Sequence, residues 1–96
     1  MVANPDVARA IIDVLHPTRV KVLRAIVGGI SQVTKISEAA GTSTSSTYDA
    51  LRVFEKYGLV KVEYEGARPK YVATEKAKRI LELYDKFIEE VRKVVK

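Results

Sequence analysis

Residues 31–71 constrain the fold more than any other stretch. Two segments whose apolar residues have helical spacing are followed there by one segment whose apolar residues alternate with polar ones. The first helical period is a short apolar stripe made of Val33, Ile36, Ala39 and Ala40. It stops at Gly41, a residue type that readily adopts the left-handed conformation that ends helices. The sequence therefore predicts a short helix followed by a turn at Gly41 and Thr42.

A second helix is predicted directly after this turn. Ser43 can offer its side-chain oxygen to the free amides of a helix N-terminus. One face of this helix is apolar, through the methyl group of Thr47 and through Ala50, Leu51 and Phe54. The opposite face is polar and carries Thr44, Ser45, Tyr48, Asp49 and Arg52. Such side chains suit the base edges and phosphates of DNA, and the helix is expected to end near Tyr57.

After Gly58 the period becomes alternating, which predicts a hairpin over about 59–73 with its turn at residues 65–68. Pro69 cannot donate a ladder hydrogen bond, so we expect it near the tip or on an edge. Arg68 and Lys70 are then expected to project from the hairpin, where they can touch a DNA backbone or enter a minor groove. Helix, turn, helix and hairpin in this order predict a winged helix-turn-helix, a mainly α fold with a small β-hairpin (α+β).

Three further helices are expected to complete a single domain of residues 1–96, at about 5–15, 17–28 and 75–95, with Thr74 as N-cap of the last. The last helix is about 30 Å long and carries a heptad-like apolar stripe. Its stripe either packs on the domain's own core or pairs with a second subunit. We favour pairing, because so long a helix extends beyond so small a domain. The predicted dimer interface consists of Ile11, Leu15, Leu81, Tyr84, Phe87, Ile88, Val91 and Val95.

Two segments, LHPTRVKVLRAIVGG (15–29) and ISEAAGTSTSSTYDALRVFEKYGLV (36–60), resemble the ArsR-type winged-helix repressors. The segment GARPKYVATEKAKRILELY (66–84) is more similar to PadR-like and other small archaeal winged-helix regulators. The resemblance implies a dimeric transcriptional regulator. We call the predicted helix that follows Ser43 the recognition helix. Metal-sensing ArsR proteins use a cysteine pair on the helix before it, where this chain has Thr34, Ile36 and Ser37. A thiolate metal sensor is therefore excluded.

Residue content argues against enzymes, metal sites and cofactors. The chain has no cysteine and one histidine, His16, which is better placed to flank the helix that begins at Pro17. Gly28 and Gly29 lack the further glycine and lysine of a phosphate-binding loop, and the serines near Ser43 have no histidine base beside them. No targeting or membrane segment is evident, so we expect a cytoplasmic, nucleoid-associated protein.

The charge pattern favours contact with a polyanion but leaves one position ambiguous. The net charge is +5, and residues 17–35 hold four cations and no acid. The polar face of the predicted recognition helix carries charges of both signs, because Asp49 lies on it together with Arg52. Asp49 either accepts a hydrogen bond from a cytosine amino group or pairs with Arg52. Tyr48 is also open to a second interpretation, as a partly buried packing residue.

Together these features predict a homodimeric, sequence-specific regulator that binds double-stranded DNA at an inverted repeat. The alternative is an architectural, chromatin-like or plasmid-partition DNA-binding protein with little sequence specificity. A third possibility is a winged helix that contacts only proteins. The content of Val, Ile, Lys and Glu also fits an archaeal source that lives at high temperature.

Overall fold

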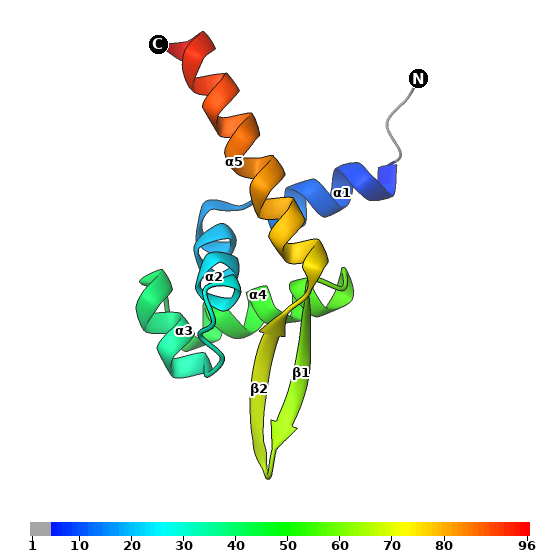
Figure 1. Ribbon diagram of the computed structural model, residues 1–96, viewed down its shortest axis with the longest axis vertical. Helices are drawn as coiled ribbons and strands as arrows, with labels where there is room; N and C mark the ends of the chain where they lie inside the picture. The colour runs from blue at the N-terminus through cyan, green and yellow to red at the C-terminus, as the bar shows by residue number, and fades with distance from the viewer. Residues whose placement is uncertain (1–4) are drawn as a thin grey trace.

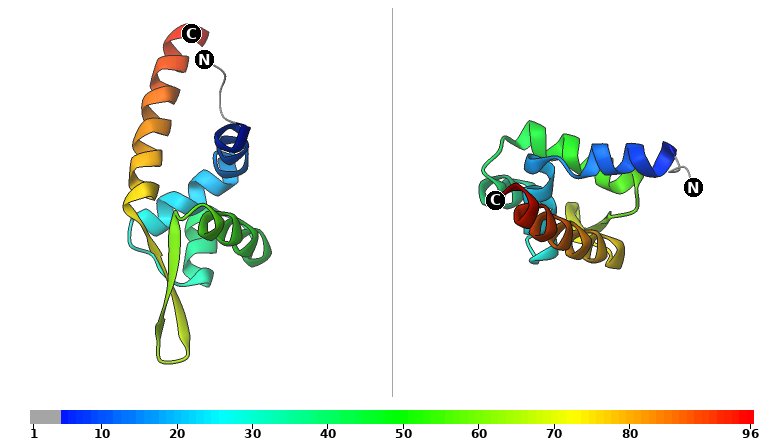
Figure 2. Two further views of the ribbon diagram at one scale, coloured as in Figure 1. Left: turned by 90° about the vertical axis from the view of Figure 1, so that its right-hand side faces the viewer. Right: turned by 90° about the horizontal axis from the view of Figure 1, so that it is seen from above.

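The computed structural model describes residues 5–96 and has the predicted α+β architecture of a winged helix-turn-helix (Figure 1). Its helices and strands, in chain order, are α1 (Pro5–Val14), α2 (Pro17–Val27), α3 (Val33–Ala40), α4 (Thr44–Lys56), β1 (Val60–Glu65), β2 (Arg68–Ala73) and α5 (Glu75–Val95). The hairpin and the free end of α5 point to opposite ends of the molecule, which measures 47 × 29 × 22 Å (Figures 1 and 2). The hairpin, called the wing below, and the long helix α5 therefore present surfaces at opposite ends of the molecule.

The turn between α3 and α4 forms as the sequence predicts. Gly41 adopts the left-handed conformation (φ 67°, ψ 36°), and its N–H donates to the carbonyl of Glu38. The Oγ of Ser43 accepts a hydrogen bond from the N–H of Ser46 at 3.0 Å, as expected of an N-cap. Local chemistry thus fixes where α3 ends and where α4 begins.

The core lies where α2, α3, α4 and the base of α5 meet, and the largest fully buried apolar side chains are Phe54, Leu23, Ile36, Leu51, Leu59 and Val22. One assignment on α3 was wrong. Ala39 is exposed, and the inward position is taken by Ser37, which is 5% exposed. Its Oγ lies 2.7 Å from Oγ1 of the fully buried Thr47 on α4. The contact between α3 and α4 is therefore partly polar.

The hairpin closes with a two-residue turn at Gly66 and Ala67, and Gly66 has a φ of 66°. The N–H of Tyr71 points away from β1 and donates to the carbonyl of Ser31 at 3.0 Å. Pro69 lies two residues earlier, so its backbone nitrogen has the same outward orientation. Pro69 has no N–H to donate, but an N–H at this position would point away from β1, so no hydrogen bond between the strands is lost. This confirms the expected position on an edge.

The start of α5 differs from the prediction in one contact. Thr74 occupies the N-cap position, but its side chain caps no helix amide. Its hydroxyl instead donates toward the carbonyls of Gly58 (2.8 Å) and Leu59 (3.1 Å). Thr74 therefore ties the base of α5 to the segment that leaves α4. His16, at the corresponding position of α2, likewise flanks the helix without a side-chain cap.

Candidate nucleic-acid interface

The polar face of α4 is exposed as a continuous surface. The side chains of Thr44, Ser45, Tyr48, Asp49 and Arg52 are all exposed. The opposite face, from Thr47 through Ala50 and Leu51 to Phe54, is buried. The structure therefore brings together the five residues that the sequence assigned to the recognition helix.

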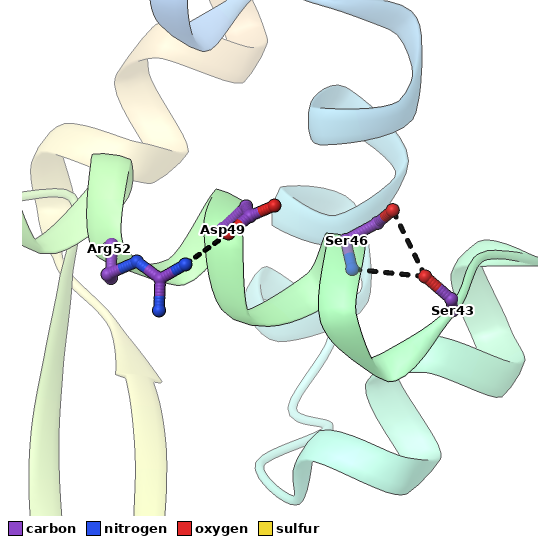
Figure 3. Close-up of polar contacts among 4 residues, drawn as sticks. All are labelled: Ser43, Ser46, Asp49 and Arg52. Atoms are coloured by element: carbon purple, nitrogen blue, oxygen red, sulfur yellow. Dashed lines mark hydrogen bonds and ion pairs between the residues drawn. The ribbon is translucent and has the colours of Figure 1, made fainter.

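Asp49 and Arg52 form an ion pair on this face (Figure 3). Their side chains are 56% and 70% exposed, and they are one helical turn apart. The pair realises one of the two interpretations left open for Asp49. An exposed ion pair of this kind contributes little to stability, so either partner can exchange it for another polar group. In this structure Asp49 is the partner of the Arg52 guanidinium.

Tyr48 is 45% exposed, which argues against a purely packing role. Tyr71 of β2 is partly buried and packs against the core. Burial raises the pKa of the Tyr71 phenol, and the nearby Tyr48, Glu55 and Tyr64 raise it further. Tyr71 therefore joins the hairpin to the core.

The wing presents two different faces. Arg68 and Lys70 are exposed, but they share their face with acidic residues, and Lys70 Nζ lies 3.5 Å from a carboxylate oxygen of Glu65. The other face carries Val62, Tyr71, Pro69 and Tyr64. Tyr64 is 71% exposed, and the sequence analysis gave it no functional role. Its place on a strand face was visible in the alternating period, but its exposure was not.

A polar cavity of about 320 Å³ lies between the N-terminal part of α4 and the helices α1 and α2. It is lined by Ile12, Asp13, His16, Thr18, Arg19, Thr42, Ser46 and Asp49. Arg19 donates a hydrogen bond to the backbone carbonyl of Asp13 at its edge. Sequence reasoning missed this cavity, because its walls come from segments far apart in the chain, namely α1, α2, the turn before α4 and α4 itself.

The predicted dimer residues lie on α1 and α5. Phe87, Ile88 and Val95 are 65%, 40% and 79% exposed, and Ile11 is 52% exposed. An apolar groove of about 720 Å³ runs between the two helices, lined among others by Ile11, Leu15, Tyr84 and Phe87. Val91 is half-buried. Leu81 is only 6% exposed within the core of its own protomer, so it does not belong to this outer face.

Further exposed apolar side chains border this face, and the sequence analysis did not assign them to it. They are Val7 (56% exposed), Leu83 (49%) and Val94 (84%). The sequence predicted an apolar stripe on α5. How much of this stripe is exposed depends on the angle at which α5 extends from the core. That angle is set by contacts between distant segments.

One such contact joins α5 to α2. Arg24 makes a two-point hydrogen-bonded ion pair with Asp85, and its guanidinium also lies 6.0 Å from the ring centre of Tyr84. The hydrogen bond from Arg24 lowers the pKa of the Asp85 carboxyl. On the other side of the groove, Tyr57 donates to the carboxylate of Asp13 at 2.9 Å, which ties the end of α4 to α1.

A family model described as the sugar-specific transcriptional regulator TrmB matches residues 15–77, which hold the helix-turn-helix and the wing. The chain belongs to the TrmB family. This family consists of transcriptional regulators, not enzymes. No curated protein matches the chain.

Solved structures show the same fold as this TrmB-family chain. A homodimeric winged helix-turn-helix DNA-binding domain from Mycobacterium bovis, a possible ArsR-family regulator, is 24% identical over 94% of this chain and 92% of that one, with a TM-score of 0.73. Rv0081 of M. tuberculosis is 22% identical over 95% and 96% of the two chains, with a TM-score of 0.77. The transcriptional repressor BigR from Xylella fastidiosa is 23% identical over 88% and 86%, with a TM-score of 0.70. The resemblance to ArsR-type regulators is thus confirmed for the fold, whereas the PadR-like wing and the archaeal source stay predictions.

Two kinds of feature are absent from residues 5–96. Within residues 5–96, no helix is both long and apolar enough to cross a membrane. The same residues contain no cluster of three or more His, Asp or Glu side chains suited to a metal ion.

Proposed function

We propose that this chain is a sequence-specific transcriptional regulator that binds an inverted repeat in double-stranded DNA as a homodimer. The observation that carries the proposal is the exposed polar face of α4, backed by a buried face that fixes the helix on the domain. Membership of the TrmB family supports it. So does the homodimeric DNA-binding domain of M. bovis, which shares the fold.

Each residue of the polar face has a proposed role. Ser45, Tyr48 and Arg52 contact bases or phosphates in the major groove. Thr44 lies at the N-terminus of α4, where helix amides favour a phosphate. Asp49 orients Arg52 before DNA arrives. Arg68 and Lys70 provide the cations of the wing.

The dimer is proposed to form through the outer faces of α1 and α5. The interface residues are Ile11, Leu15, Tyr84, Phe87, Ile88, Val91 and Val95. A chain of 96 residues buries a modest share of its surface, so covering this apolar face should add stability. A two-fold dimer places two recognition helices in successive major grooves about 34 Å apart.

A titration tests the proposal. Fragments of the organism's genome that the protein captures are compared with random duplexes of equal length over a range of salt concentrations. A specific regulator binds the captured fragments about 10³-fold more tightly or better. Equal affinities with a steep salt dependence support the architectural alternative, and absence of binding to any duplex at low salt supports protein contacts alone.

A further inference from the structure

The polar cavity between α4 and the helices α1 and α2 holds charged groups of both signs. Its volume of about 320 Å³ lies at the lower end of the range of roughly 300–1,000 Å³ that small-molecule sites occupy. Its carboxylates belong to Asp13 and Asp49, and its guanidinium belongs to Arg19. Arg19 forms an ion pair with neither carboxylate. The cavity therefore offers positive and negative groups that do not neutralise one another.

Arg19 supplies the positive end of the cavity. It is half-buried, and its guanidinium donates to the backbone carbonyl of Asp13, but it forms no ion pair within residues 5–96. That contact occupies one of its N–H groups, so others remain for a second acceptor. A guanidinium that is partly removed from water is stabilised most by a carboxylate or phosphate. The hydroxyl of Thr18 and the imidazole of His16 line the same cavity. This end suits a carboxylate of a ligand.

The carboxylates of Asp49 and Asp13 supply the negative charge. One oxygen of Asp49 pairs with Arg52, and the other oxygen points away from Arg52 (Figure 3). One oxygen of Asp13 accepts a hydrogen bond from the hydroxyl of Tyr57 at 2.9 Å. Each of these contacts uses only one of the two oxygens of its carboxylate. The hydroxyl of Ser46 lies on the same wall of the cavity. These acceptors suit an ammonium group, which has three donors.

Other classes of small molecule fit this arrangement less well. A simple anion would face the carboxylates of Asp13 and Asp49, and a simple cation would face Arg19. A neutral polyol would displace water from all three charged groups without supplying a charge to any of them. A molecule that carries a carboxylate and an ammonium group a few bonds apart offers each charged group its opposite.

We propose that this cavity binds a free amino acid, whose carboxylate is held by Arg19 and whose ammonium group is held by Asp49 of the recognition helix. The carboxylate that receives the ammonium group is also the partner of Arg52. Binding therefore neutralises Asp49 and weakens its hold on Arg52, so the exposed face of α4 becomes more cationic. This regulation of DNA binding rests on the proposed function, whereas the binding site itself does not.

Calorimetric titration of the full chain without DNA tests the site. The probes are the standard L-amino acids at neutral pH, followed by the N-acetyl and carboxamide derivatives of those that bind. We expect saturable binding of at least one amino acid. Each derivative should bind about tenfold more weakly or worse, because it lacks one of the two charges. Glucose and inorganic phosphate are the neutral and anionic comparisons, and neither should bind.

Substitutions assign the binding to the cavity. Arg19→Gln and Asp49→Asn should each weaken it about tenfold or more, and Arg19→Lys should retain more affinity than Arg19→Gln. Lys21→Gln and Glu55→Gln are the matched controls, because they remove the same charges from exposed positions of α2 and α4 outside the cavity. Asp49 is exposed, so Asp49→Asn should unfold at the wild-type temperature and remains informative even where Arg19→Gln does not fold.

The regulation is measured on a duplex that the wild type selects. A saturating concentration of the amino acid should tighten binding to this duplex about fivefold, and DNA should tighten amino-acid binding by the same factor. Asp49→Asn already lacks the negative charge, so its affinity for the duplex should not respond to the amino acid.

The outcomes are distinguishable. A folded wild type that binds no amino acid, or that binds glucose or a derivative equally well, overturns the amino-acid site and leaves the proposed function intact. Equal affinities in the wild type, Arg19→Gln and Asp49→Asn also overturn it, because the binding then lies outside the cavity. Amino-acid binding without any change in DNA affinity overturns the regulation alone. Failure of the wild type to bind any duplex removes the proposed function and the regulation, but not the amino-acid site.

Discussion

The hydroxyl of Ser37 lies 2.7 Å from that of Thr47, inside the contact between α3 and α4. Both side chains are buried, and their oxygens also lie within hydrogen-bond distance of the carbonyls of Val33 and Ser43. Two hydroxyl hydrogens serve these three contacts, so one hydroxyl donates to the other and the second donates to its carbonyl. Because hydrogen bonds require a defined geometry, the network fixes how the recognition helix is held against α3.

Thr47→Val tests this contact, since it keeps the shape of the side chain and removes the hydroxyl. We expect a loss of about 1 kcal/mol in the free energy of unfolding, measured by urea denaturation. Thr44→Val is the matched control, because Thr44 is exposed. Equal effects of the two substitutions would show that the buried hydroxyl does not stabilise the helix pair.

Arg52→Ala tests the recognition helix. The guanidinium is exposed and forked, and we expect its removal to weaken binding to the selected duplex by about 1 to 3 kcal/mol if it contacts guanine. The measurement is a titration against that duplex and against variants with single base changes. Unchanged affinity and unchanged sequence preference would remove Arg52 from the residues that contact DNA.

Asp49→Asn separates affinity from specificity. It removes a negative charge from the DNA-facing surface and releases Arg52 from its ion pair. We expect tighter binding to random duplexes and a smaller ratio between selected and random duplexes. Weaker binding to the selected duplex that depends on a single cytosine would instead show that Asp49 contacts that base.

Phe87→Glu tests the dimer. Phe87 is 65% exposed in the protomer, and a carboxylate at this position would be buried without a partner in the proposed interface. We expect sedimentation to show monomers for Phe87→Glu and dimers for Lys86→Glu, which alters the adjacent exposed position. A dimer that persists in Phe87→Glu would contradict an interface on this part of α5.

Asp85→Asn tests the ion pair between α2 and α5 through pH. The pKa of Asp85 is lowered in the folded state by its hydrogen bond from Arg24, so the pair stabilises the fold above the unfolded pKa of about 3.9. This contribution is lost as the pH falls through the lowered pKa. We expect wild type and Asp85→Asn to differ in stability near neutral pH and to converge in acid. A difference that persists unchanged at low pH would contradict the assignment.

Local signals predicted the helix-turn-helix, because Gly41 and Ser43 determine the turn with their own backbone and side chain. Contacts between distant segments could not be predicted in this way. On α3, helical spacing from Val33 selects Ser37 and not Ala39, but residue polarity favoured Ala39. The partner that lets Ser37 be buried is Thr47, which lies on another helix.

The limits of pattern reasoning are also clear on α5 and the wing. A heptad-like stripe does not show where a helix leaves its own core, which is why Leu81 was grouped with residues that lie outside it. Alternation shows which residues share a strand face, but not that the face extends beyond the core at Tyr64. The contacts of the recognition helix with DNA and the pairing of α1 and α5 stay predictions.

Selection of bound duplexes from a random pool tests the central claim most directly, because it reports specificity, spacing and symmetry together. A dimer with one recognition helix per subunit should enrich an inverted repeat whose half-site centres are about 10 base pairs apart, or a multiple of that spacing. A pool that stays random after repeated rounds, although the protein retains DNA, would contradict a sequence-specific dimeric regulator.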